Sequence, residues 1–118
     1  MMPAKIKTIW DKFVHGSLRY TSEQTHLLNL SVANAEYAQG LAFEQQQHTH
    51  NALWFYLRAA SHGDCNAQFK LGISYLKGEL NVQQDLREAK KWLMLAAEQG
   101  HQEARLLLSN FVSSLQYS

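Results

Sequence analysis

The sequence has little cysteine, proline or glycine. Its 118 residues include one cysteine, one proline and six glycines. A single cysteine excludes an internal disulfide framework and a zinc site built from several cysteines. It also fits a reducing compartment, so we expect a cytoplasmic protein. The scarcity of glycine and proline leaves few turn positions for a β-rich fold and favours helices.

The sequence also lacks an excess of charge of one sign and long hydrophobic runs. Lysine and arginine total 11 and aspartate and glutamate total 10, which gives a net charge of +1. This balance offers no general attraction to nucleic acid, so no nucleic-acid partner is expected. No run approaches the roughly 18 apolar residues of a membrane-spanning helix. Asp11 and Lys12 interrupt the apolar stretch that a signal peptide would need.

Small and aromatic residues recur along the chain at two fixed intervals. A shift of 37 residues aligns like with like: Ala52 with Ala89, Phe55 with Trp92, Gly63 with Gly100 and Ala67 with Ala104. A shift of 32 residues does the same for the preceding stretch: Ala35 with Ala67, Gly40 with Gly72 and Phe43 with Tyr75. The chain therefore contains two repeat units, the first of which has a shortened loop.

Apolar residues recur with helical spacing inside each unit. Ala67, Leu71 and Tyr75 form one stripe, and Asp85 is a predicted N-cap. Glycines at 40 and 72 fall inside predicted helices, where glycine costs about 1 kcal/mol relative to alanine. Each glycine indicates that another backbone crosses closely at that point. Helices are expected near residues 4–15, 22–30, 33–46, 51–62, 65–77, 86–99 and 102–115.

The recurring residues resemble the unit of the Sel-one-like repeat family, relatives of the tetratricopeptide repeats. The second unit matches that pattern throughout: Ala67, Leu71, Gly72, Tyr75, Gly78, Val82, Asp85, Ala89, Trp92, Ala96, Ala97 and Gly100. The first unit matches it in part: Ala35, Gly40, Phe43, Ala52, Phe55, Ala59, Ala60 and Gly63. The first 30 residues match hardly at all.

This resemblance implies an all-α fold, an α/α superhelix (a tetratricopeptide-like solenoid) of about seven helices. It implies a non-catalytic adaptor that binds a protein or peptide partner. We expect one domain over residues 1–118, divided into N-terminal capping helices (1–32), a shortened first repeat (33–64), a second repeat (65–101) and a C-terminal capping helix (102–118).

A second set of apolar residues recurs on the first helix of each unit, away from the repeat stripe. Phe69 and Ile73 lie at about 200° and 240° from Ala67 on a helical wheel of roughly 100° per residue. The set contains Tyr37, Leu41, Phe69, Ile73 and Leu106, with Lys70 and Lys77 beside it. One interpretation is an apolar strip on the concave surface that receives a partner segment. The other is packing between neighbouring first helices.

The N-terminal segment carries an amphipathic pattern. One face of the helix expected at 4–15 holds Ile6, Ile9, Trp10, Phe13 and Val14. The main interpretation is a helix that caps the open end of the array. The alternatives are a homodimer contact or a partner-binding helix through Trp10 and Phe13, or a helix on a membrane surface. Three lysines are too few for firm membrane anchoring.

Enzymatic and metal-binding motifs are scarce. No phosphate loop, serine elbow or paired-carboxylate motif is present, so we do not expect an enzyme or a cofactor. A less favoured alternative is a metal-dependent protein that uses His48, His50, His62 and Cys65. Zinc needs three or four ligands in fixed geometry, and these residues supply only separate pairs, so no metal site is expected. Cys65 at a helix start is a candidate for a lowered pKa, or else a small packing residue.

Overall fold

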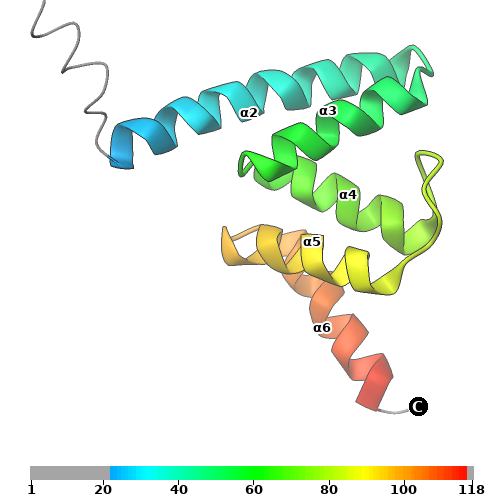
Figure 1. Ribbon diagram of the computed structural model, residues 1–118. Coiled ribbons are helices and arrows are strands. Elements are labelled where there is room, and N and C mark those ends of the chain that lie inside the picture. Colours follow the sequence, from blue (N-terminus) through cyan, green and yellow to red (C-terminus); the bar gives the residue numbers. More distant parts are fainter. Residues whose placement is uncertain (1–21, 117–118) are drawn as a thin grey trace, which may run out of the picture.

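A computed structural model describes residues 22–116 of the chain (Figure 1). Over this range it consists of five helices: α2 (Ser22–Gln45), α3 (Thr49–Ser61), α4 (Cys65–Lys77), α5 (Leu86–Glu98) and α6 (Gln102–Gln116). The described residues contain no β strand. The expected all-α fold is confirmed.

The number of helices differs from the seven expected. The helix expected at 4–15 lies outside the described residues. The helices expected at 22–30 and 33–46 are one continuous helix, α2, so the predicted break between them is wrong. The physical reason is that no glycine or proline occurs between Gly16 and Gly40, and nothing at positions 31 and 32 therefore ends the helix.

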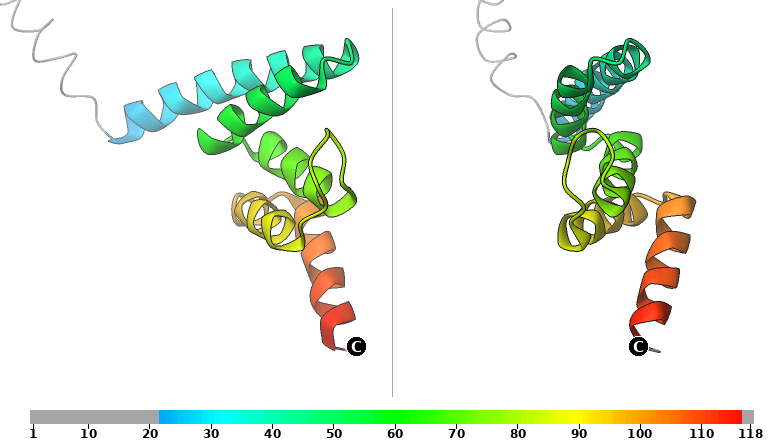
Figure 2. Two further views of the ribbon diagram at one scale, coloured as in Figure 1. Left: turned by 45° about the vertical axis from the view of Figure 1, so that its right-hand side comes forward. Right: turned by 90° about the vertical axis from the view of Figure 1, so that its right-hand side faces the viewer.

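Each helix packs against the one before and the one after it, which produces a stacked, solenoid-like array. The pairs α2 and α3, α3 and α4, α4 and α5, and α5 and α6 are in contact, as Figures 1 and 2 show. The last helix leaves the stack to one side in the second view of Figure 2. At the other end, α2 has 24 residues against 13 in α3, and its first turns run past the end of α3 (Figure 1).

Small residues allow the helices to approach closely. The main core contains the alanines 52, 59, 60 and 67 together with Tyr56 and Leu71, all buried. A Cβ atom added at Gly40 would lie 2.6 Å from Cε1 of Tyr56, and one added at Gly72 would lie 2.7 Å from Cγ of Leu93. A close neighbour is therefore present at each glycine. At Gly40 it is the side chain of Tyr56 and not the predicted backbone, whereas at Gly72 the backbone nitrogen of Leu93 also lies within 3.4 Å.

Glycine and aspartate define the ends of the helices. Gly63 and Gly100 follow α3 and α5 with φ of 99° and 95°, a conformation that strains any other residue. The predicted N-cap is confirmed, because the carboxylate of Asp85 accepts hydrogen bonds from the backbone N–H groups of Arg87 and Glu88. Asp64 caps α4 in the same way through the N–H of Ala67, at 2.8 Å.

Candidate functional site

The predicted strip is spread over three helices, with Tyr37 and Leu41 on α2, Phe69 and Ile73 on α4 and Leu106 on α6. Four of these side chains are half-buried. Leu106 differs, because 65% of its surface is exposed. The strip is thus least covered at its α6 end.

The α2 part of the strip supports the core. Tyr37 and Leu41 pack against the buried cluster around Tyr56, and the rings of Tyr37 and Tyr56 are 5.8 Å apart. Burial raises the pKa of Tyr37 above its ordinary value. Packing within the chain therefore accounts for much of the apolar character of this part of the strip.

Phe69 connects α4 to the start of α6. Its ring stacks on the imidazole of His101 at a centroid distance of 4.2 Å and an interplanar angle of 23°. It also packs against the smaller core cluster that contains Leu93, Ala96 and Ala104. Packing between neighbouring first helices therefore accounts for Phe69, whereas Ile73 and Leu106 keep exposed surface.

The two lysines beside the strip have different surroundings. Nζ of Lys70 lies 2.8 Å from Oε1 of Glu44, and the hydroxyl of Tyr56 donates a hydrogen bond of 2.8 Å to the other oxygen of this carboxylate. Burial, and then the bond to Glu44, raises the pKa of Tyr56. Lys77 is exposed in the last turn of α4. The charge of Lys70 is therefore engaged inside the chain, and Lys77 is the better placed of the two to meet a partner.

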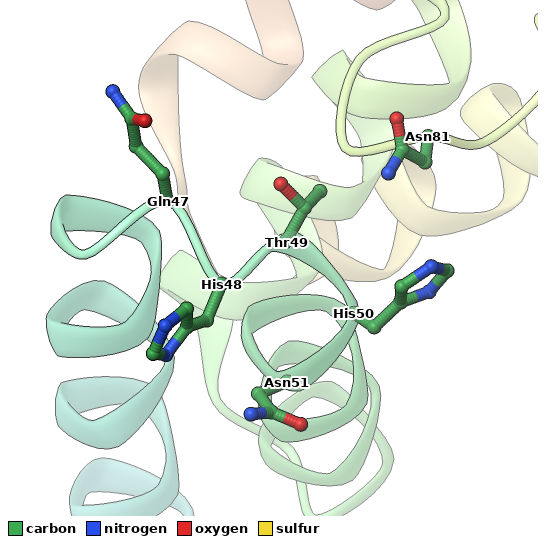
Figure 3. A pocket seen from close by; sticks show the side chains of 6 residues that line it. All are labelled: Gln47, His48, Thr49, His50, Asn51 and Asn81. Carbon is green, nitrogen blue, oxygen red and sulfur yellow. The ribbon is translucent and has the colours of Figure 1, made fainter.

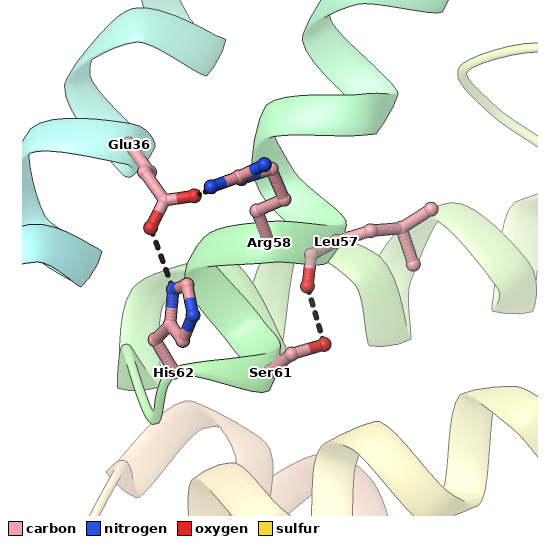
Figure 4. A network of polar contacts seen from close by, with 5 residues as sticks. All are labelled: Glu36, Leu57, Arg58, Ser61 and His62. Atoms are coloured by element: carbon pink, nitrogen blue, oxygen red, sulfur yellow. Dashed lines mark hydrogen bonds and ion pairs between the residues drawn. The ribbon is translucent and has the colours of Figure 1, made fainter. Parts of the chain in front are cut away.

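A polar network that the sequence analysis missed ties α2 to α3 (Figure 4). Glu36 is 7% exposed, accepts a hydrogen bond of 2.6 Å from Nε of Arg58 and lies 2.6 Å from Nδ1 of His62. Burial alone raises the pKa of Glu36, but the bonds and charges of Arg58 and His62 outweigh it and hold the pKa below its ordinary value. Arg58 also lies 4.6 Å from the ring centroid of the exposed Trp54.

A shallow hollow of about 510 Å³ adjoins this network. It is lined by Trp54, Leu57, Arg58, Ser61 and His62, and the hydroxyl of Ser61 donates to the carbonyl of Leu57.

The sequence signal that predicts the polar network around Glu36 is the repeat itself. The shifts of 32 and 37 residues place Glu36 on Gln68 and His62 on Gln99, and Nε2 of Gln99 donates a 2.8 Å hydrogen bond to Oε1 of Gln68.

The candidate metal ligands do not converge. His48 and His50 point to opposite sides of the turn between α2 and α3, beside a hollow of about 310 Å³ (Figure 3). His62 and Cys65 follow the other end of α3, whose 13 residues span about 20 Å. The four side chains therefore cannot share one ion. Among residues 22–116 no group of three or more histidine, cysteine, aspartate or glutamate residues is placed to hold a metal.

The contacts of Cys65 show that it packs inside the fold. It is half-buried, packs against the smaller core cluster and points its sulfur at the carbonyl of Ala96, at 3.7 Å. Burial, and then the charge of Asp64, raises the pKa of its thiol. The lowered pKa considered from the sequence is wrong, because the buried setting of the sulfur and its acidic neighbour both disfavour the thiolate.

Two further expectations concern the membrane and the N-terminus. Of the helices described between residues 22 and 116, none combines the length and apolar character that crossing a membrane requires. Trp10 and Phe13 lie outside the described residues.

The comparison with family models bears on the whole arrangement. The model of the Sel1 repeat matches twice, over residues 29–64 and 65–101. Neither the curated proteins nor the solved structures include a match to the chain. The first stretch holds α2 from residue 29 on together with α3, and the second holds α4 and α5; together they make up more than half of the 118 residues. The chain therefore belongs to the Sel1 repeat family.

Proposed function

We propose that the protein is a non-catalytic adaptor that binds a segment of a partner protein along the concave side of its first helices. Sel1 repeats are generally protein–protein interaction modules. The observation that carries the proposal is the exposure of Leu106, at 65%, together with the partial exposure of Ile73 at the equivalent face of the preceding first helix. Covering such side chains on binding removes apolar surface from water, at about 25 cal/mol per Å².

The strip favours a partner of a particular chemistry. The partner segment would place apolar side chains over Ile73 and Leu106. The Phe69–His101 stack would hold α4 against the start of α6. An acidic group at one end of the segment would meet Lys77. Because the contact is mainly apolar, we expect its affinity to depend little on salt. We place this interaction in the cytoplasm, where the single thiol of Cys65 stays reduced.

The test is affinity capture from a lysate of the source cell, followed by reconstitution with the purified partner. The bait proteins are the wild type, a variant with Ile73→Glu and Leu106→Glu, and the control Met94→Glu. Met94 is a matched control because it is 44% exposed and lies on α5, the second helix of its repeat, away from the first helices that carry the strip. Circular dichroism first establishes that all three fold. We expect the wild type and the control to retain the partner and the double variant to lose it. Equal retention by all three, or by none, would contradict the proposal.

A further inference from the structure

One face of α2 is apolar and exposed. The residues on this face recur at helical spacing and are Leu28, Val32, Ala35, Ala38 and Ala42, here called the α2 strip. Leu28 and Val32 are 49% and 47% exposed. The residues that flank the strip on the same face, Leu27, Ser31 and Gln39, are uncharged and exposed. An uncharged face of this kind is typical of a helix that packs against another helix.

The second repeat indicates what such a face contacts. The shift of 32 residues places Ala35 on Ala67. Ala67 and its neighbour Leu71 are fully buried, in one cluster with Ala59 and Ala60 of the preceding helix α3. In the first repeat, no helix between residues 22 and 116 packs on the corresponding face of α2. The part of the α2 strip around Ala35 therefore corresponds to the face of α4 on which the preceding helix packs, whereas Leu28 and Val32 lie before it, on positions 60 and 64, which precede α4.

The length of α2 gives a second reason for a partner there. Its 24 residues span about 36 Å, whereas the 13 residues of α3 span about 20 Å. The first turns of α2 extend beyond α3 (Figure 1). A helical segment of fewer than about 12 residues is marginal in water without packing. Packing on Leu28 and Val32 would supply the missing support.

We propose that residues 4–15 form a helix that packs antiparallel on the α2 strip, over Leu28 and Val32. Their sequence predicts one apolar face, with Ile6 and Ile9 on it. Residues 16–21 connect this segment to Ser22 and number six, within the 2–8 residues that usually join antiparallel helices. A helix of 12 residues is about 18 Å long, so it reaches back along α2 to the region of Val32 and stops short of Ala42.

The tether favours this segment over a second copy of the chain. A segment joined by a short linker has an effective concentration of about 1 mM at the face beside it, well above that of a free second molecule in dilute solution. The inference does not depend on the proposed adaptor function, since the α2 strip lies apart from Ile73 and Leu106.

Paired cysteines in the full-length chain test the proposal. In a Cys65→Ser background, one variant carries Ile6→Cys with Val32→Cys and a second carries Ile9→Cys with Leu28→Cys. The control carries Ile6→Cys with Ala42→Cys, on the same face but beyond the reach of the helix. Disulfide formation requires Cβ atoms about 3.8 Å apart. The two pairs therefore test nearly the same antiparallel register at two places along the helix.

Under mild oxidation we expect at least one of the two pairs to lose both free thiols in a protein of monomer mass, while the control keeps its thiols. Covalent dimers from these pairs would show that a second copy covers the α2 strip and would overturn the proposal. Oxidation of both pairs no faster than the control would overturn it as well, because the segment then has no preferred place on α2.

Discussion

Glu36 and Gln68 occupy equivalent positions in the two repeats, and each is bound by the residue that follows the second helix of its own repeat. Glu36 lies 2.6 Å from His62, and Gln68 accepts a hydrogen bond of 2.8 Å from Gln99. Both side chains are buried. The same contact between helices is therefore made by a carboxylate and an imidazole in the first repeat and by two neutral amides in the second.

This difference predicts acid sensitivity in the first repeat. The folded pKa of Glu36 is below its ordinary value of 4.5, so its ionised form stabilises the fold above that pH. That stability is lost as the pH falls through the folded pKa. We expect Glu36→Gln to lower the free energy of unfolding at neutral pH by about 1–2 kcal/mol, since a charge-assisted bond is lost. The variant should also flatten the decline of stability between about pH 5 and pH 3.

Urea unfolding at a series of pH values measures this effect. Glu98→Gln is the control, because Glu98 is exposed at the end of α5. If the free energy of unfolding of the Glu36→Gln variant falls with acid as steeply as that of the wild type, ionised Glu36 does not stabilise the fold in this way.

The close contact of Gly72 with Leu93 predicts that alanine at this position destabilises the fold. A Cβ there would lie 2.7 Å from Cγ of Leu93 and 3.4 Å from its backbone nitrogen. Alanine gains about 1 kcal/mol of helix propensity, but overpacking a core costs about 1–3 kcal/mol. We expect a net loss in the free energy of unfolding.

A double-mutant cycle with Leu93→Ala separates the contact from other effects. Leu93→Ala alone leaves a cavity and should cost about 2–5 kcal/mol. Combined with Gly72→Ala, it should cost less than the two changes added together, because the clash is gone. If the two losses in the free energy of unfolding are strictly additive, a Cβ atom at position 72 does not clash with the side chain of Leu93.

Cys65 should react slowly with thiol reagents in the folded protein. Its pKa is raised by burial and by Asp64, so the reactive thiolate is scarce near neutral pH. Alkylation by iodoacetamide, followed by mass spectrometry, should be many-fold faster in denaturing urea than in buffer. Equal rates in the two conditions would contradict the buried setting of this sulfur.

Much of the fold was predictable from the sequence because its signals are local. Asp85 and Gly100 define helix ends through contacts within a few residues of the chain, and Gly72 marks a close approach by its type alone. The predicted break in α2 at positions 31 and 32 failed for the opposite reason. No residue there ends a helix, and only the expectation of a separate capping helix suggested one.

The site was harder to predict because its contacts are distant in the sequence. Glu36 and His62 are separated by 26 positions. Phe69 on α4 stacks on His101, which follows α5. A helical wheel places Phe69 and Leu106 on equivalent faces, but it does not show that the first is half-buried and the second exposed. Comparing the polar residues of the two repeats, and not only the apolar ones, would have paired Glu36 with Gln68.

The adaptor function is tested most directly by the dissociation constant for the captured partner, measured by calorimetry. The proteins compared are the wild type, Leu106→Glu and the control Met94→Glu, all single changes at exposed positions. A buried charge at a binding hot spot costs at least about 1.4 kcal/mol, so Leu106→Glu should weaken binding about tenfold or more while Met94→Glu leaves it unchanged. A Leu106→Glu variant that binds as tightly as the wild type would contradict a partner site on the first helices.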